Sequence, residues 1–356
     1  MIHLSPSPQG VGPGNRPPPP GAGNERYGMV HKNDFDGQLQ LGVATLTETT
    51  GRESHRKVSD MIAAGYVNPH TGRLREEVSV CRACPVCDDD NPELLFAKNG
   101  FPHVRCSKCG MIYVSPMLSD KARNEMYRSD EAWTEVQANP VEKGYRVNLY
   151  RYGLGRVGPP RATKRLLDVG CGPGLFMATA SAAGWQVAGV EMNSHWVAKL
   201  RLSDCDIIEA PFEEVELPKG SYECVTMWDV LEHVPCPSMF MRKARSLLAI
   251  GGRLLLLVPN ADSLANRMLH EKSRSFDGAQ HVNFYSAKVL EQSLRCEGFV
   301  VRSMETVFSE VGTIANHLDY QAPYTGAAER LPMLTPEMIH AFMLGSRLLA
   351  LAEKVE

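Results

Sequence analysis

The stretch LLDVGCGPGLFM, residues Leu166–Met177, joins an apolar run to a glycine-rich turn and then to a second apolar run. Glycine has no Cβ, so such a turn can bend sharply and lie close against a ligand. A dinucleotide-binding fingerprint needs glycine or alanine where Leu175 stands, so a pyrophosphate fits poorly. The acid Asp168 before the turn instead favours a ligand that carries an ammonium group. The three glycines are Gly170, Gly172 and Gly174.

Short apolar strands alternate with amphipathic stretches from residue 162 onward. The predicted strands are RLLDVG (165–170), WQVAGVE (185–191), CDIIEA (205–210), ECVTMWD (223–229), GGRLLLLVP (251–259) and FVVRSMETV (299–307). Helices are predicted to begin near Leu175, Ser194, Pro237 and Ala287. This alternation predicts an α/β fold with a doubly wound, mostly parallel sheet. No convincing strand follows, because RLLALAEKVE (347–356) looks helical.

The second predicted strand ends at Glu191, in the sequence VAGVEMN. A carboxylate at this place can accept hydrogen bonds from both hydroxyls of a ribose. The predicted ligand therefore carries a ribose and an amino group but no pyrophosphate. S-adenosylmethionine fits this description.

Five segments stand in an order and spacing that resemble class I S-adenosylmethionine-dependent methyltransferases, a Rossmann-like family. They are LLDVGCGPG (166–174), GVEMN (189–193), VTMWDVLEHVPCP (225–237), GGRLLLLVPN (251–260) and HVNFYSAKVLEQSLRCEGF (281–299). The bacterial branch related to ubiquinone-biosynthesis O-methyltransferases is the most similar. The resemblance covers about residues 165–307. It implies that the cofactor is bound by Asp168, Gly170, Cys171, Gly172, Gly174, Glu191, Met192, Phe212, Trp228 and Asp229.

An acid–acid–histidine set follows the fourth predicted strand, at Asp229, Glu232 and His233. In a helix these three residues would share one face. The first interpretation is a capping box with Asp229 as the N-cap, and the second is a general base at His233. The third, implied by the resemblance, is a divalent metal site formed by all three residues. His281, before the last long helix, is a further candidate for the acceptor site.

Two cysteine pairs, CPVC (84–87) and CSKCG (106–110), form a C-x2-C…C-x2-C pattern. Such pairs can present four thiolates tetrahedrally to zinc, and a closed site of this kind is structural. The predicted zinc ligands are Cys84, Cys87, Cys106 and Cys109. Cys81 offers a second register with Cys84, but Pro85 favours the pair formed with Cys87. Gly110 permits the turn of the second knuckle, whereas Asp88 stands at the matching place in the first.

The chain of 356 residues is predicted to hold one main domain with accessory segments. They are a disordered Pro/Gly-rich tail (1–78), a zinc ribbon (79–115), a helical linker (116–161), the methyltransferase domain (162–310) and a C-terminal helical segment (311–356). The net charge of −3 gives no general attraction to nucleic acid. Clustered cysteines, with no signal peptide or apolar run long enough for a transmembrane segment, predict a cytoplasmic protein.

The sequence therefore predicts an enzyme that methylates a small-molecule or glycan acceptor, at oxygen in the favoured interpretation. Nucleic acid is not the expected partner. A basic and aromatic stretch, KGYRVNLYRYGLGRV (143–157), nevertheless keeps open a zinc-ribbon RNA methyltransferase or RNA-binding protein. A catalytically silent cofactor-binding protein is the third alternative. The acceptor, the pathway and the oligomeric state do not follow from the sequence.

Overall fold

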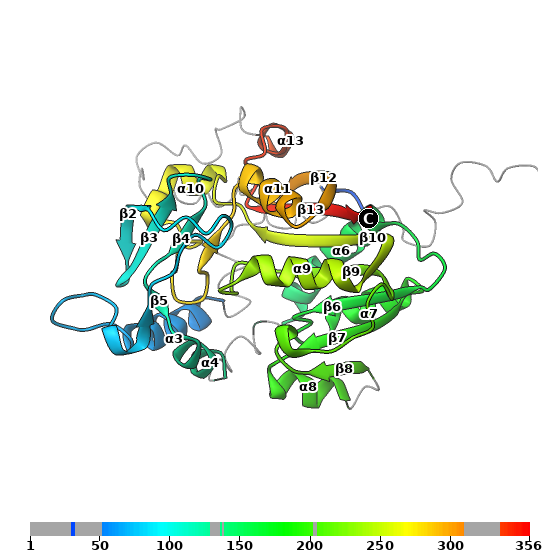
Figure 1. Cartoon of the computed structure of the whole chain (residues 1–356), viewed down its shortest axis with the longest axis horizontal. Coiled ribbons are helices and arrows are strands. Elements are labelled where there is room, and N and C mark those ends of the chain that lie inside the picture. The colour runs from blue at the N-terminus through cyan, green and yellow to red at the C-terminus, as the bar shows by residue number, and fades with distance from the viewer. Residues whose placement is uncertain (1–29, 33–51, 129–135, 137–138, 202–204, 310–334) are drawn as a thin grey trace, which may run out of the picture.

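The computed structural model describes residues 30–32, 52–128, 136, 139–201, 205–309 and 335–356, and its largest element is a seven-stranded sheet (Figure 1). In spatial order the strands are β12 (Phe299–Val307), β13 (Arg347–Lys354), β10 (Leu248–Pro259), β9 (Tyr222–Trp228), β6 (Arg165–Val169), β7 (Gln186–Glu191) and β8 (Asp206–Glu209). Strands β10, β9, β6, β7 and β8 are parallel, and β13 is antiparallel to both of its neighbours. The predicted doubly wound, mostly parallel sheet is confirmed.

The sheet starts in its middle, at β6, and runs outward to β7 and β8 before it returns to β9 and β10. The direction of winding reverses between β6 and β9. In open α/β sheets, ligands bind at such a switch point, outside the carboxyl ends of the strands. The glycine loop follows β6, so the fold places it at this point.

Helices cover both faces of the sheet (Figure 1). Their bounds are α6 (Pro140–Val157), α7 (Leu175–Ala182), α8 (Ser194–Arg201), α9 (Pro237–Leu247), α10 (Leu264–Leu269), α11 (Ala287–Cys296) and α13 (Pro336–Ala341), with 3-10 turns η3 (Phe212–Glu214) and η4 (His270–Lys272). Side chains of α9 and α11 share one buried cluster with the sheet, and those of α6 and α7 share another. Successive residues Leu254 and Leu255 enter opposite clusters, because side chains alternate along a strand. The predicted helix starts at Leu175, Ser194, Pro237 and Ala287 are confirmed.

The C-terminal prediction was wrong, because Arg347–Lys354 is strand β13 and not a helix. Strand β13 lies between β10 and β12, and its successive side chains enter the buried clusters on the two faces of the sheet. A strand of this kind is an unbroken apolar run without polar alternation, which periodicity cannot distinguish from a buried helix. Only α13 in the described part of this segment is helical. The final strand that the sequence analysis did not find is therefore present.

The ribbon is an antiparallel sheet formed by β2 (Pro92–Lys98), β3 (Phe101–Cys106) and β4 (Ile112–Val114). Its fourth strand, β11 (Asn283–Phe284), comes from the other end of the chain and pairs with β4. A second, two-stranded sheet pairs β1 (Ser79–Val80) with β5 (Met117–Leu118). The ribbon is therefore completed by a segment from the C-terminal half of the chain.

Two predicted boundaries also need correction. Residues 52–78, assigned to a disordered tail, include α3 (Arg52–Ala64) and the 3-10 turn η2 (Glu76–Val78), while residues 1–29 and 33–51 lie outside the described residues. Ala63 and Leu74 are buried in one cluster with ribbon residues. The predicted linker is helical at α4 (Asp120–Arg128) and α6, but α6 packs on the sheet and belongs to the main domain. Among the described residues, no helix is long and apolar enough to cross a membrane.

Candidate active site and metal centres

The glycine loop leaves β6 with its backbone in the left-handed region. Gly170, Gly172 and Gly174 have φ of 69°, 50° and 78°. The amides of Gly170 and Cys171 donate to the Val190 carbonyl at 2.8 and 3.2 Å, which holds the loop against the end of β7. A Cβ on Gly174 would come within 2.4 Å of a Leu200 methyl carbon. Both the backbone conformation and close packing therefore require glycine here.

Glu191 ends β7 beside this loop and has a fixed carboxylate. One oxygen accepts from the Gly172 amide at 2.9 Å, and the other accepts from the amides of Met192 and Asn193 at 2.8 and 2.9 Å. A carboxylate has about four lone-pair sites and these amides use three, so this group can accept a further bond from a ribose hydroxyl. Met192 is 44% exposed next to it, which leaves an apolar surface for a purine ring. These residues fit the ribose and base of S-adenosylmethionine.

Asp168 lies beneath the loop rather than on its surface. Its carboxyl is buried and accepts from the Thr226 hydroxyl at 2.7 Å. Burial raises the pKa of Asp168 to about 8, the bond from Thr226 lowers this pKa and the charge of Glu191 raises it. A bound cation nearby would favour the ionised carboxylate. Asp168 thus suits a ligand with an ammonium or sulfonium group.

Three predicted cofactor residues have side chains that belong to the core. Phe212 packs against Phe240 with ring centroids 5.3 Å apart. Trp228 packs against Tyr150 and Phe176, and Cys171 lies in a small buried cluster. These buried side chains pack inside the core, so they are not exposed for contact with a cofactor.

The capping interpretation of Asp229 was wrong. Asp229 has φ 54°, residues 231–233 form a turn, and the next helix begins only at Pro237. The carboxylate of Asp229 lies 3.3 Å from Arg347 Nε and 3.9 Å from Arg146 Nη1. Arg146 also pairs with the fully buried Glu142 at 2.8 Å. Sequence analysis missed both arginines as site residues, because Arg347 reaches this edge only through strand β13.

Glu232 is buried completely in the same loop. Its backbone carbonyl accepts from the amides of Val282 and Asn283 at 2.7 and 3.1 Å, which ties the loop to β11. Neither oxygen of its side chain has a hydrogen-bond partner. Burial raises the pKa of Glu232, and the negative charge of Asp229 raises it further.

His233 and His281 meet next to Glu232, with ring centroids 4.7 Å apart. Nδ1 of His233 lies 3.1 Å from the Gln280 carbonyl and 2.9 Å from the Tyr127 hydroxyl. Nδ1 of His281 lies 3.3 Å from the Ser275 carbonyl. Burial lowers the pKa of His233 to about 3 and that of His281 to about 4. The structure thus joins the sequence candidates His233 and His281, and it adds Tyr127, which no motif marked.

The four ribbon cysteines form a compact cluster in which the sulfur atoms lie within 4.8 Å of one another. Cys81 is exposed and does not belong to this cluster. Asp88 and Gly110 occupy matching places after the two pairs, with φ of 57° and 81°. Their amides donate to the carbonyls of Cys84 and Cys106, each at 3.0 Å. The two knuckles therefore have the same turn, although only one carries glycine.

Arg82 joins the ribbon to the loops that carry His233 and His281. Its guanidinium donates to the carbonyl of Val114 in β4 at 3.1 Å and to that of Pro235 at 2.9 Å. It also donates to the Val282 carbonyl at 2.5 Å and to Oδ1 of Asn283 at 2.9 Å. These partners lie in the loop of His233 and in the segment after His281. One half-buried side chain thus connects the ribbon to both histidine loops.

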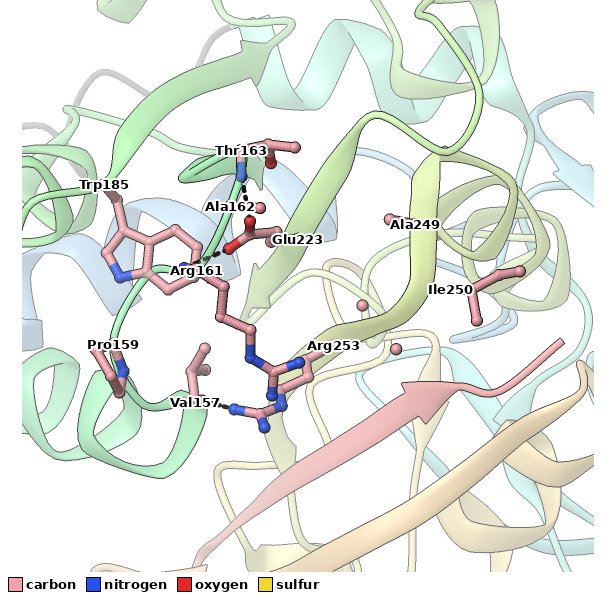
Figure 2. A pocket seen from close by; sticks show the side chains of 12 residues that line it. Val157, Pro159, Arg161, Ala162, Thr163, Trp185, Glu223, Ala249, Ile250 and Arg253 are labelled. Atoms are coloured by element: carbon pink, nitrogen blue, oxygen red, sulfur yellow. Dashed lines mark hydrogen bonds between the residues drawn. The ribbon is translucent and has the colours of Figure 1, made fainter. Parts of the chain in front are cut away.

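A pocket of about 210 Å³ lies at the opposite edge of the sheet, at the amino ends of the strands (Figure 2). Arg161, Trp185 and Arg253 line it, and Glu223 accepts a hydrogen bond there from the Arg161 amide at 2.7 Å. The glycine loop, Glu191 and the histidine pair all stand at the carboxyl ends. This pocket is therefore separate from the candidate active site.

A protein family described as "Methyltransferase domain" matches residues 144–304. The ubiquinone biosynthesis O-methyltransferases of Ralstonia nicotianae and Xanthomonas axonopodis are 33% and 34% identical to this chain over 105 and 116 residues. The matches cover 27% and 31% of this chain and 43% and 48% of those proteins, less than half of each relative. A solved methyltransferase from Archaeoglobus fulgidus is 16% identical, with a TM-score of 0.45 over 63% of this chain and all of that one.

Proposed function

We propose that this chain, whose residues 144–304 form a class I S-adenosylmethionine-dependent methyltransferase domain, transfers a methyl group to an oxygen of a small-molecule or glycan acceptor. The observation that carries the proposal is the fixed carboxylate of Glu191 beside the glycine loop. The cofactor supplies an activated methyl group when bound, so the protein mainly has to align donor and acceptor. The O-methyltransferases among the relatives favour an oxygen acceptor.

We propose that the cofactor lies along the carboxyl ends of β6 and β7. Glu191 would hold the ribose, Met192 would lie against the adenine, and Asp168 would favour the charged methionine end. Asp229, held by Arg347, would border the sulfonium side. The acceptor oxygen would approach from the side of His233 and His281, where neutral imidazole nitrogens can accept a hydrogen bond or a proton from a hydroxyl.

Zinc in the ribbon is part of the proposal. Cys84 and Cys109 Sγ atoms are 3.5 Å apart, as are those of Cys87 and Cys106. Burial raises the pKa of the Cys84 thiol to about 11, so thiolates at this place need a cation. The four sulfur ligands would hold zinc in a closed structural site, of a kind that persists in a reducing compartment such as the cytoplasm.

The divalent metal set implied by the family resemblance does not fit this structure. It requires Asp229, Glu232 and His233 together, but the Asp229 carboxylate faces Arg347 and Arg146. The RNA alternative also loses its support, because Tyr145 and Tyr150 of the basic stretch are buried in the core. Arg146 is held by Glu142 and Asp229. We therefore propose no second function.

Calorimetric titration with S-adenosylhomocysteine tests the cofactor site. Glu191→Ala should weaken binding about 10- to 100-fold, since hydrogen bonds to a charged group contribute about 1.5–3 kcal/mol. Glu209→Ala is the matched control, because Glu209 pairs in register with Glu191 on the next strand. A folded, zinc-loaded wild type that binds no S-adenosylhomocysteine would contradict the proposal. Tight binding without turnover on any hydroxylated acceptor would favour the catalytically silent alternative.

A further inference from the structure

We propose that the pocket at the amino ends of the strands binds a small organic acid through Arg161, Arg253 and Trp185 (Figure 2). The ligand class is an apolar body of about one ring that carries a carboxylate or a phosphate group. The glycine loop and the histidine pair stand at the carboxyl ends of the strands, so this pocket is a second binding site. The inference does not rest on the proposed function.

An interruption of the main sheet opens this pocket. Strand β10 departs from its partner β9 between Leu248 and Arg253, where four residues of β10 stand opposite Glu223 alone. The four residues, 249–252, include Gly251 with φ 74°, and all of them line the pocket. Such bulges re-aim side chains and are common beside binding sites. This bulge lies at the edge away from the glycine loop, so the cofactor site gives no reason for it.

Two guanidinium groups, those of Arg161 and Arg253, lie together at one side of the pocket (Figure 2). Burial lowers the pKa of Arg253, and the positive charge of Arg161 lowers it further. Arg253 also donates to the carbonyl of Val157, which fixes its side chain. The Arg161 guanidinium has no hydrogen bond or ion pair with any residue that the structure describes. An anion between the two groups would offset their repulsion, and arginine binds carboxylates and phosphates with paired hydrogen bonds.

The two carboxylates near these arginines already have partners. Glu223 accepts from three backbone amides in the segment 161–164. Its carboxylate lies by the backbone of Arg161 and not by the paired guanidinium groups (Figure 2). Glu353, on strand β13, accepts from Arg302 at 3.0 and 3.2 Å. Neither carboxylate therefore takes the place of an external anion between the two guanidinium groups.

The remaining lining is mostly apolar and sets the size of the ligand. Trp185 is only 5% exposed, and its Nε1–H has no hydrogen-bond partner in the described part of the chain. Buried N–H groups normally have a partner, which an oxygen of a bound ligand would supply. Val157, Pro159 and Ala249 add apolar surface. The volume of about 210 Å³ exceeds that of an apolar cavity of about 150 Å³ that binds benzene, so one ring with an acid group fits.

Isothermal titration calorimetry of the full chain with benzoate and with phenyl phosphate tests this site. At least one of them should bind with a dissociation constant of about 0.1–1 mM, as expected for a ligand of this size, and the tighter one identifies the acid group. Neutral benzamide and inorganic phosphate should each bind at least about 10-fold more weakly, because each lacks one half of the ligand. Tryptophan fluorescence should change on binding, and Trp185→Phe should remove this change.

Arg161→Met should weaken binding about 10- to 100-fold, because it removes hydrogen bonds to a charged group. Arg105→Met, which removes an exposed arginine of the ribbon, is the matched control and should bind as the wild type does. Ala162→Phe fills the pocket and keeps both arginines, so it should also weaken binding. Arg161 and Ala162 are both exposed, so these variants should fold, and circular dichroism checks this.

Absence of binding of either acid up to about 10 mM would overturn the inference. So would wild-type affinity in Arg161→Met, or inorganic phosphate that binds as tightly as the two acids. Competition between the acid and S-adenosylhomocysteine would place the acid in the cofactor site and would also overturn it. Binding of the acid by a chain that binds no S-adenosylhomocysteine would support this inference and contradict the proposed function, so the two failures are distinguishable.

Discussion

The ribbon cysteines and the Glu232–His233–His281 cluster are both groups of metal-binding side chains, but the chain assembles them differently. The ribbon uses two knuckles of equal spacing and like turn geometry, each fixed by local hydrogen bonds. The second cluster takes two neighbours from one loop and a third residue from a loop far along the chain. Local spacing therefore specifies the cysteine cluster, whereas the fold of the whole chain specifies the Glu232–His233–His281 cluster.

The two regions are also physically connected. β4 of the ribbon pairs with β11, which begins two residues after His281. Arg82 of the ribbon donates to loops on both sides of the histidine pair. The ribbon thus supports the segments that carry His233 and His281. Four changes would break or sharpen this comparison.

Loss of the ribbon zinc should have the largest effect. Cys106→Ser, or removal of zinc by a chelator, is expected to cost at least about 5 kcal/mol of the free energy of unfolding, because structural zinc binding in small peptides is worth roughly 10–16 kcal/mol. The ribbon cysteines share one core cluster with the main sheet, so the loss should reach beyond the ribbon. Chemical denaturation monitored by circular dichroism measures it. Cys81→Ser is the matched control, and equal stability of both variants would show that the thiols hold no metal.

Removal of the Arg82 side chain should have the second-largest effect on stability. Arg82→Met would leave several buried acceptors without a donor, which typically costs about 3–5 kcal/mol. Arg105→Met, on the exposed face of β3, should change stability little. Hydrogen exchange should show faster opening of residues 280–284 in the Arg82 variant. Unchanged hydrogen exchange at these residues would show that Arg82 does not stabilise the histidine loop.

Acid should destabilise the ribbon through His103. Burial lowers the pKa of His103 to about 4, and an unfolded histidine has a pKa of about 6.5. The unfolded state therefore binds more protons between these values, and stability is lost as pH falls from 6.5 toward 4. The loss by pH 5 is about 2 kcal/mol. Chemical denaturation at pH 7 and at pH 5 measures this loss of stability. His103→Leu should reduce the difference in stability between the two pH values.

Glu232→Gln should have the smallest effect on the free energy of unfolding, within about 1 kcal/mol, because both the neutral acid and the amide are polar groups of similar shape. Thermal unfolding of both proteins measures this difference. A loss of several kcal/mol would show that the Glu232 carboxyl has a partner that the amide cannot replace.

Much of the fold could be predicted from local patterns. Every strand expected between residues 165 and 307 is present, because parallel strands with short connections leave runs of apolar residues between glycine, proline and polar turns. The choice of Cys84 with Cys87, rather than Cys81 with Cys84, was predicted equally well, since Pro85 and Gly110 favour the two turns. The errors at Asp229 and at 347–354 have one cause. Helical periodicity was assumed where tertiary contacts impose a left-handed turn and a strand buried on both faces.

The sequence by itself determined the glycine loop, the carboxylate of Glu191 that ends the next strand and the four thiols, because each depends on neighbours within a few residues. Only the tertiary structure decided which residues accompany Glu232 and His233. The antiparallel strand β13 carries Arg347 to Asp229, and the pairing of β11 with the ribbon places His281 beside His233. These contacts join residues 48 to 170 positions apart, and no local propensity records such a separation.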